Sequence, residues 1–180
     1  DELCPPHAVL SSNTSQFSVT AIAAATKRPE KVVGMHWFLP AAVLRLIEIV
    51  RGDDTSEETV AIVEELSKSC GKETVVCKDR QGFITTRALV ALATECLRML
   101  EEGVASKEDI DKAIRLGLNH PMGPLELSDY SGLELHVKAA DAMAKVYGER
   151  FLTTQTVRNL VQAGHYGRKT GRGLYDYKKK

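Results

Sequence analysis

The spacing of hydrophobic residues changes near residues 79–82, and this change constrains the fold more than any other feature of the chain. Before it, short apolar runs bounded by Gly, Pro and polar residues alternate with helical stretches, which is typical of buried strands and helices in an α/β domain. After it, apolar residues recur with helical spacing almost to the end of the chain. We therefore expect the end of an α/β domain over residues 1–80 and an all-helical domain over residues 81–180.

The predicted elements follow from this pattern. In the first part we expect strands over 8–12, 32–38, 44–50 and 74–77, and helices over 19–26 and 55–69. A capping box at Thr55–Glu58 would begin the longer helix, and Gly71 would end it. In the second part we expect helices over 83–101, 106–116, 125–130, 133–147 and 154–163. The helix from Phe83 is apolar on most sides, which predicts burial on most sides, under its own domain or against a partner.

Composition excludes several classes of function. Charges balance, with 24 Lys and Arg against 24 Asp and Glu, so no basic excess indicates a nucleic acid or an anionic membrane surface as a partner. No apolar run reaches the length of a transmembrane helix. The four cysteines lack metal-ligand spacing, so we expect reduced thiols, no metal site and a cytoplasmic location.

Two neighbouring apolar runs carry one candidate general base. The first run delivers His36 to its end, Pro40 interrupts the pattern, and the second run carries Glu48. A carboxylate that pairs with an imidazole fixes its tautomer and raises its basicity, which is how a general base near neutral pH is built. A core histidine and a surface glutamate would give the same pattern, so the spacing alone does not decide between the two interpretations.

Five further motifs accompany this pair along the chain. They are Ser11–Ser15, Asp79–Arg87, Ser106–Asp111, Asn119–Pro124 and Gly167–Tyr175. In this order the set resembles the L-3-hydroxyacyl-CoA dehydrogenase family, which includes the bacterial 3-hydroxybutyryl-CoA dehydrogenases. Each motif alone would be weak evidence, but the resemblance covers essentially all 180 residues.

The resemblance implies a fold and a reaction. The fold would be the α/β end of a Rossmann-type sheet, followed by an all-α domain like the C-terminal domain of 6-phosphogluconate dehydrogenase. The reaction would be the oxidation of an L-3-hydroxyacyl-CoA, such as 3-hydroxybutyryl-CoA, to a 3-ketoacyl-CoA with NAD, or its reverse, in fatty-acid or butanoate metabolism. A base must then remove the hydroxyl proton while hydride leaves the same carbon for the nicotinamide.

The family carries its Gly-rich dinucleotide fingerprint in an N-terminal βαβ unit. No G-x-G-x-x-G occurs in this chain. We therefore expect this N-terminal unit to be absent, the chain to be the C-terminal part of a longer enzyme, and the fragment alone to be inactive. NAD would be bound mainly by the absent unit.

The resemblance also implies the roles of individual residues. His36 would be the general base, oriented by Glu48. The hydroxyl of Ser15 would bond the 3-oxygen of the substrate, and Asn13 and Ser15 would contact the cofactor from the carboxyl end of a strand, where open α/β sheets bind ligands. Thr86 would contact the substrate from the start of the helical domain.

Three positions depart from the family pattern. Thr86 stands where the family has Asn, Leu39 replaces the Asn that usually precedes Pro40, and Gln81 replaces a Pro. A threonine hydroxyl has one donor where an amide has two, and leucine has none. The chain could therefore come from a working enzyme with a changed substrate preference or lowered activity. The alternative is a catalytically inactive fragment or degenerate homologue that acts as a dimerising binding module.

The remaining expectations concern partners and the C-terminus. The resemblance implies an acyl-CoA substrate and a homodimer formed through the helical domain, with no nucleic acid and no membrane partner. The Gly167–Gly173 segment could be a phosphate-binding nest. The resemblance favours a turn that docks Tyr175 and Tyr177.

Overall fold

The computed structural model describes residues 1–178, which form two compact units, Asp1–Thr86 and the chain from Arg87 onward. The first unit contains one sheet of β1 (Leu10–Ser12), β2 (Val32–Trp37), β3 (Leu46–Arg51) and β4 (Glu73–Lys78), in that spatial order. The first and last pairs of neighbours are parallel, whereas β2 and β3 are antiparallel. All four predicted strands are present, with ends shifted by one or two residues.

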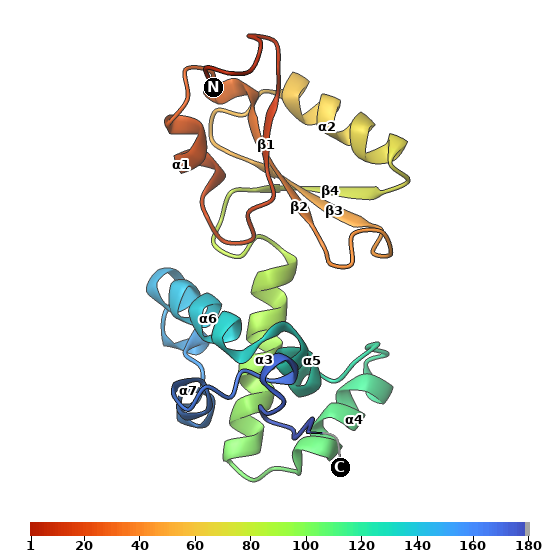
Figure 1. Ribbon diagram of the computed structural model, residues 1–180, viewed down its shortest axis with the longest axis vertical. Helices are drawn as coiled ribbons and strands as arrows, with labels where there is room; N and C mark the ends of the chain where they lie inside the picture. Colours follow the sequence, from red (N-terminus) through yellow and green to blue (C-terminus); the bar gives the residue numbers. More distant parts are fainter. Residues whose placement is uncertain (179–180) are drawn as a thin grey trace. The chain divides into compact units, whose positions relative to one another are not determined.

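Helices cover both faces of this sheet, with α1 (Val19–Ala24) and α2 (Glu57–Ser69) on opposite sides (Figure 1). Successive side chains of a strand point to opposite faces, so a sheet covered twice needs apolar residues at nearly every position. The core on the α2 side comprises Val33, Met35, Ile47, Ile49, Val60 and Val63, and that on the α1 side Val19, Ala23, Val32, Val50 and Phe83.

The predicted capping box of α2 was wrong by one residue. Ser56, not Thr55, is the N-cap, and its hydroxyl accepts a hydrogen bond from the amide of Thr59. The buried hydroxyl of Thr55 accepts from the amide of Gly52 and donates to the carbonyl of Val32. Thr55 therefore closes the loop after β3, and the helix begins at the next polar residue.

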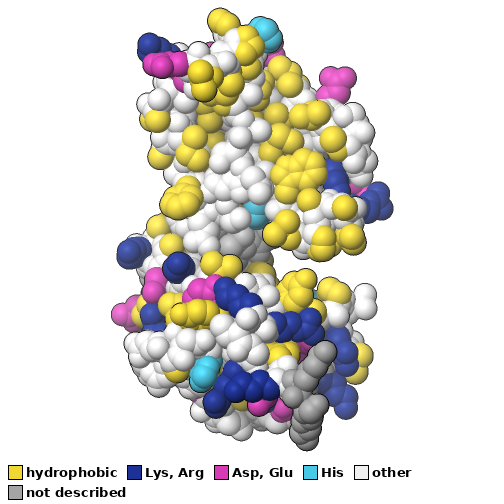
Figure 2. All heavy atoms as spheres, viewed as in Figure 1, with side chains coloured by type: hydrophobic (Ala, Val, Ile, Leu, Met, Phe, Trp, Pro, Cys, Tyr) yellow, Lys and Arg dark blue, Asp and Glu magenta, His cyan; other side chains and the backbone are white. Residues whose placement is uncertain are grey.

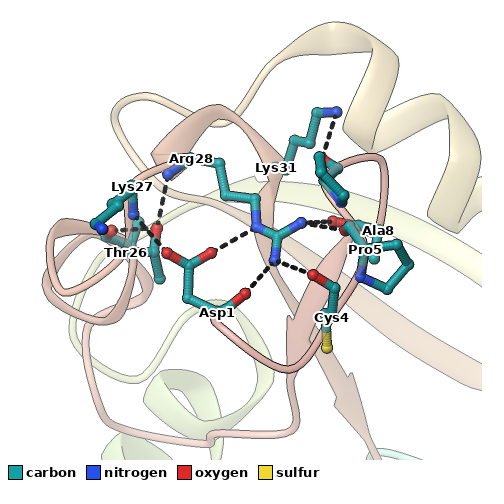
Figure 3. Close-up of polar contacts among 10 residues, drawn as sticks. Asp1, Cys4, Pro5, Ala8, Thr26, Lys27, Arg28 and Lys31 are labelled. Atoms are coloured by element: carbon teal, nitrogen blue, oxygen red, sulfur yellow. Dashed lines mark hydrogen bonds and ion pairs between the residues drawn. The ribbon is translucent and has the colours of Figure 1, made fainter.

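A buried arginine fixes the segment that leads into β1 (Figure 3). Arg28 is 8% exposed, and its Nε lies 2.6 Å from Oδ1 of Asp1. Its terminal nitrogens donate to the carbonyls of Asp1, Cys4 and Pro5, at 2.7, 3.2 and 2.5 Å. Because a buried guanidinium is costly without partners, these bonds specify the path of residues 1–8.

The second unit consists of helices, with a short 3-10 turn after α6 and another before the C-terminus. Its helices are α3 (Thr85–Glu101, whose first two residues belong to the first unit), α4 (Lys107–Gly117), α5 (Pro124–Ser131), α6 (Leu133–Tyr147) and α7 (Gln155–Gln162). Their existence and order agree with the predicted pattern. Ser106 caps α4 as expected, because its hydroxyl accepts from the amide of Asp109.

The start and the burial of α3 differ from the prediction. The helix begins at Thr85, two residues late, because Phe83 has a left-handed φ of 48° and cannot belong to a right-handed helix. Burial on most sides was too strong an expectation: Val90 and Leu97 are buried, whereas Ile84, just before the helix, and Leu89 are exposed.

The C-terminal turn docks onto the helices through Asp129 and Tyr175. The buried carboxylate of Asp129 accepts hydrogen bonds from the amides of Leu174 and Tyr175, at 2.9 and 2.8 Å. The Tyr175 hydroxyl donates to Asp111 at 2.8 Å and lies 3.0 Å from the Lys107 carbonyl. The docking of Tyr175 is therefore confirmed. None of the helices formed by residues 1–178 is long and apolar enough to span a membrane.

Candidate active site

The antiparallel pairing of β2 with β3 places His36 directly opposite Glu48. Facing side chains in such a pair lie on the same side of the sheet with their Cβ atoms about 5 Å apart. His36 Nδ1 lies 2.7 Å from Glu48 Oε2, and the residues are 5% and 0% exposed. The predicted convergence of strand ends was wrong for Glu48, which is the third residue of β3. The antiparallel direction of β3 is what brings the two side chains together.

Aromatic rings surround the imidazole of His36. The ring of Phe38 lies 4.6 Å from it and that of Phe83 lies 5.7 Å from it, between centroids. Since Nδ1 is occupied by Glu48, Nε2 is the nitrogen that can exchange a proton with another molecule. The arrangement is that of a histidine whose tautomer and orientation are set by a carboxylate.

The buried carboxylate of Glu48 has a further partner in Thr85. Its Oε1 accepts from the backbone amide of Thr85 at 2.8 Å, and its Oε2 lies 3.2 Å from the Thr85 hydroxyl. Burial alone would raise the pKa of Glu48, but the hydrogen bonds from His36 and Thr85 outweigh it and hold the pKa below its usual value. Thr85 was missed in the sequence. Its signal was a polar residue in the first turn of a helix that has no capping side chain before it.

The loop after β1 contains Asn13 and Ser15, the predicted cofactor contacts. Asn13 Oδ1 accepts from the amide of Trp37 at 2.9 Å, which ties the loop to the residue after His36. Ser15 is exposed, and the turn is made by its neighbour Thr14, whose hydroxyl accepts from the amide of Phe17 at 2.7 Å. No hydrogen bond found within residues 1–178 joins Ser15 or Thr86 to the His36–Glu48 pair.

Two residues at the end of β4 support this loop. Asp79 accepts from the hydroxyl of Ser18 at 2.7 Å and from the amide of Thr20 at 2.8 Å. Burial would raise the pKa of Asp79, but these hydrogen bonds lower it overall. Gln81 Nε2 donates to the carbonyl of Gln16 at 3.4 Å. Neither role was visible in the sequence, because each depends on a contact between segments about 60 residues apart.

The loop between β2 and β3 has an apolar tip. Leu39 is 82% exposed, and Val43 and Leu44 in the same loop are exposed as well. Hydrophobic side chains are visible on the surface of the first unit, whereas Lys and Arg side chains gather on the helical unit in this view (Figure 2). Thr86 is half-buried at the second position of α3. At both positions that depart from the family pattern, the side chain therefore remains partly or largely accessible.

The substitution Glu48→Gln is expected to weaken the pH dependence of stability of the first unit. The folded pKa of Glu48 is lowered, so its carboxylate stabilises the fold above the unfolded pKa, and this contribution is lost as the pH falls through the folded pKa. The free energy of unfolding should therefore fall less steeply from neutral to acid pH in the variant. Denaturant titrations at several pH values, followed by the fluorescence of Trp37, measure this. Parallel pH profiles for the two proteins would contradict it.

Comparison with known proteins agrees with this geometry. Residues 1–80 match the family model described as the NAD binding domain of 3-hydroxyacyl-CoA dehydrogenase, and residues 82–177 match that of the C-terminal domain. The chain belongs to the 3-hydroxyacyl-CoA dehydrogenase family. Residues of both family domains are present, and the absence of the Gly-rich βαβ unit stays a prediction from the sequence.

Individual relatives and solved structures support the same assignment. The chain is 42% identical to a probable 3-hydroxybutyryl-CoA dehydrogenase of Bacillus subtilis, over 100% of this chain and 63% of the relative. It is 41% identical to human mitochondrial hydroxyacyl-coenzyme A dehydrogenase, over 99% of this chain and 57% of the relative. The crystal structure of Mycobacterium tuberculosis FadB2 is similar with a TM-score of 0.93 and 44% identity, over 97% of this chain and 62% of that chain.

The chain therefore spans less than two thirds of the length of these relatives. The predicted fold class, the end of a Rossmann-type sheet followed by an all-helical domain, is confirmed by the mixed sheet, the helices and these neighbours.

Proposed function

We propose that this chain is part of an NAD-dependent 3-hydroxyacyl-CoA dehydrogenase that acts on 3-hydroxybutyryl-CoA or a related short acyl-CoA, in either direction. The observation that carries the proposal is the buried His36–Glu48 pair, with its 2.7 Å hydrogen bond, in a chain of this family. The B. subtilis relative, named a probable 3-hydroxybutyryl-CoA dehydrogenase, supports the choice of substrate.

The residues of the chain supply the proton chemistry. In the oxidative direction, His36 Nε2 accepts the proton of the 3-hydroxyl group, and the positive charge that forms on the ring is stabilised by Glu48 at Nδ1. The C3–O bond becomes a carbonyl as the hydride leaves C3. The exposed hydroxyl of Ser15 is available to bond the 3-oxygen.

The loop after β1 fits a polar cofactor. Asn13 has its oxygen bound to the chain, which leaves its amide nitrogen as a donor, and the Ser15 hydroxyl is exposed beside it. Both follow the carboxyl end of β1, which is parallel to β2. Asn13 and Ser15 would contact NAD, which supplies the hydride acceptor when bound.

The direct test is an assay of the protein at its natural length with acetoacetyl-CoA and NADH. We expect NADH oxidation that depends on the CoA ester, and none with free acetoacetate. The 180-residue chain alone should show no turnover, because NAD would be bound mainly outside it. No CoA-dependent turnover by the natural-length protein would contradict the proposal.

The alternative is a degenerate homologue that acts as a dimerising module, and it is favoured by Leu39 and Thr86. The double substitution Leu39→Asn and Thr86→Asn restores both amides of the family pattern. If the site is in use, kcat/KM should rise by about tenfold, since hydrogen bonds to a polar substrate contribute on the order of 1 kcal/mol each. Leu44→Asn, at an exposed leucine in the same loop as Leu39, is the matched control. No gain in the double variant would favour the degenerate homologue.

Two further expectations belong to the same proposal. A homodimer would form through the helical unit, and exposed apolar residues such as Leu89 on α3 support this. A cytoplasmic location is proposed from the sequence alone.

A further inference from the structure

Helix α3 begins without a capping side chain of its own. The first helical residue is Thr85, and it is preceded by Ile84, which has no hydrogen-bond acceptor in its side chain. The first amides of a helix have no partner within it, and Ser, Thr, Asp or Asn at the preceding position normally supplies one. Here the acceptor for the Thr85 amide is Glu48 Oε1, 2.8 Å away and 37 residues earlier in the chain.

The hydroxyl of Thr85 makes a second contact with the same carboxylate. It lies 3.2 Å from Glu48 Oε2, the oxygen that also bonds His36 Nδ1 at 2.7 Å. A carboxylate is an acceptor only, so the hydroxyl must donate. Three donors therefore meet the fully buried carboxylate, and two of them come from one residue.

These donors oppose the cost of burying a charge. A buried carboxylate without partners would bind a proton, and a neutral Glu48 would be a poor partner for a protonated imidazole. The first amides of α3 also present the positive end of the helix dipole to it. The charge of Glu48 is felt nearby: burial raises the pKa of Cys77 to about 11, and the Glu48 carboxylate adds to this effect.

We propose that Thr85 is a positioning residue of this site, whose amide and hydroxyl hold the Glu48 carboxylate ionised and turned toward His36. The inference deepens the proposed function and rests on it. When His36 accepts the substrate proton at Nε2, its Nδ1 proton stays bound to Glu48 Oε2. The Thr85 hydroxyl lowers the basicity of that oxygen, so the proton remains on the ring and Glu48 keeps the charge that stabilises the imidazolium.

The first test reads the carboxylate directly and needs no activity. The 180-residue chain with carbon-13-labelled glutamate is titrated by NMR as wild type, Thr85→Val and Thr85→Ser. Valine keeps the backbone amide and the shape but removes the hydroxyl. We expect Glu48 to titrate at higher pH in Thr85→Val, and Thr85→Ser to titrate like the wild type. Equal titration of Glu48 in all three proteins would overturn the proposal.

A matched control lies on the same helix. Thr94 is fully buried, and its hydroxyl has no hydrogen-bond partner among the described residues. Thr94→Val therefore makes the same chemical change away from Glu48 and should leave the Glu48 titration unmoved. Should Val not be accommodated at position 85, Thr85→Ala removes the same hydroxyl and provides the same measurement.

The second test is kinetic and uses the protein at its natural length. Thr85→Val should lower kcat by about tenfold, as expected for the loss of one hydrogen bond to a charged group, with KM changed less than about twofold. Thr85→Ser should restore kcat. Wild-type kcat in Thr85→Val would overturn the proposal. If the wild-type protein shows no dehydrogenase activity but the Glu48 titration shifts, the proposed function fails while the positioning of Glu48 by Thr85 stands.

Discussion

Replacing His36 by alanine is expected to lower kcat of the natural-length protein by about two to four orders of magnitude, the usual contribution of a general base. The reason is geometric: Glu48 binds Nδ1 at 2.7 Å, so that Nε2 of His36 is the group that can take the substrate proton. KM should change little, because the imidazole acts on the proton in flight more than on the bound ground state. The measurement is the steady-state rate of CoA-ester reduction by NADH.

The controls separate the base from other histidines. His7 is exposed at the start of the chain, and His7→Ala should leave kcat unchanged. His136 is a poor candidate for the base, because burial lowers its pKa to about 4 and its Nε2 lies 3.1 Å from the Thr153 hydroxyl within the helical unit. Added imidazole should restore part of the activity of His36→Ala. Unchanged turnover in His36→Ala would refute the proposed role.

The sequence was most informative where hydrophobic spacing alone decides the structure. The runs around Val33 and Ile49 predicted buried strands, and α6 spans the predicted residues 133–147 because its apolar positions recur with helical spacing and Gly132 and Gly148 flank it. Such local patterns need no knowledge of what the element packs against.

The direction of β3 was beyond the sequence. The loop between Trp37 and Leu46 is long enough to return the chain either way, so the pairing of His36 with Glu48 was expected from the resemblance and from strand ends. The structure achieves it through antiparallel register instead. The contact was therefore predicted correctly, and the geometry behind it was not.

The residues that support the site were missed for a related reason. Thr85 and Asp79 each have local polar neighbours that resemble ordinary caps and turns. Their partners, Glu48 and Ser18, are 37 and 61 residues away along the chain. Only the folded arrangement shows that Thr85 caps α3 with a side chain from the sheet, and that Asp79 fixes the loop after β1.

The second large effect is expected at the C-terminal turn, where Gly173→Ala should destabilise the helical unit by roughly 3 kcal/mol or more. A Cβ atom on residue 173 would lie 2.1 Å from Asp129 Oδ1 and 2.6 Å from the Cα of Gly167. The methyl group must displace the carboxylate that binds the amides of Leu174 and Tyr175. A fully buried carboxylate would then lose its partners, and Tyr175 would lose its support.

The matched control is Gly117→Ala, since Gly117 is the last residue of α4 and a Cβ atom there meets no other atom within 4 Å. It should change stability by less than about 1 kcal/mol, because only the backbone preference of glycine is altered. Denaturant unfolding followed by far-ultraviolet circular dichroism reports chiefly on the helices, whereas the fluorescence of Trp37, the single tryptophan, reports on the first unit. The dichroism midpoint should fall in Gly173→Ala more than the fluorescence midpoint does. Equal midpoints for Gly173→Ala and Gly117→Ala would mean that the turn can move away from Asp129 at little cost, and that the buried carboxylate does not hold the C-terminus in place.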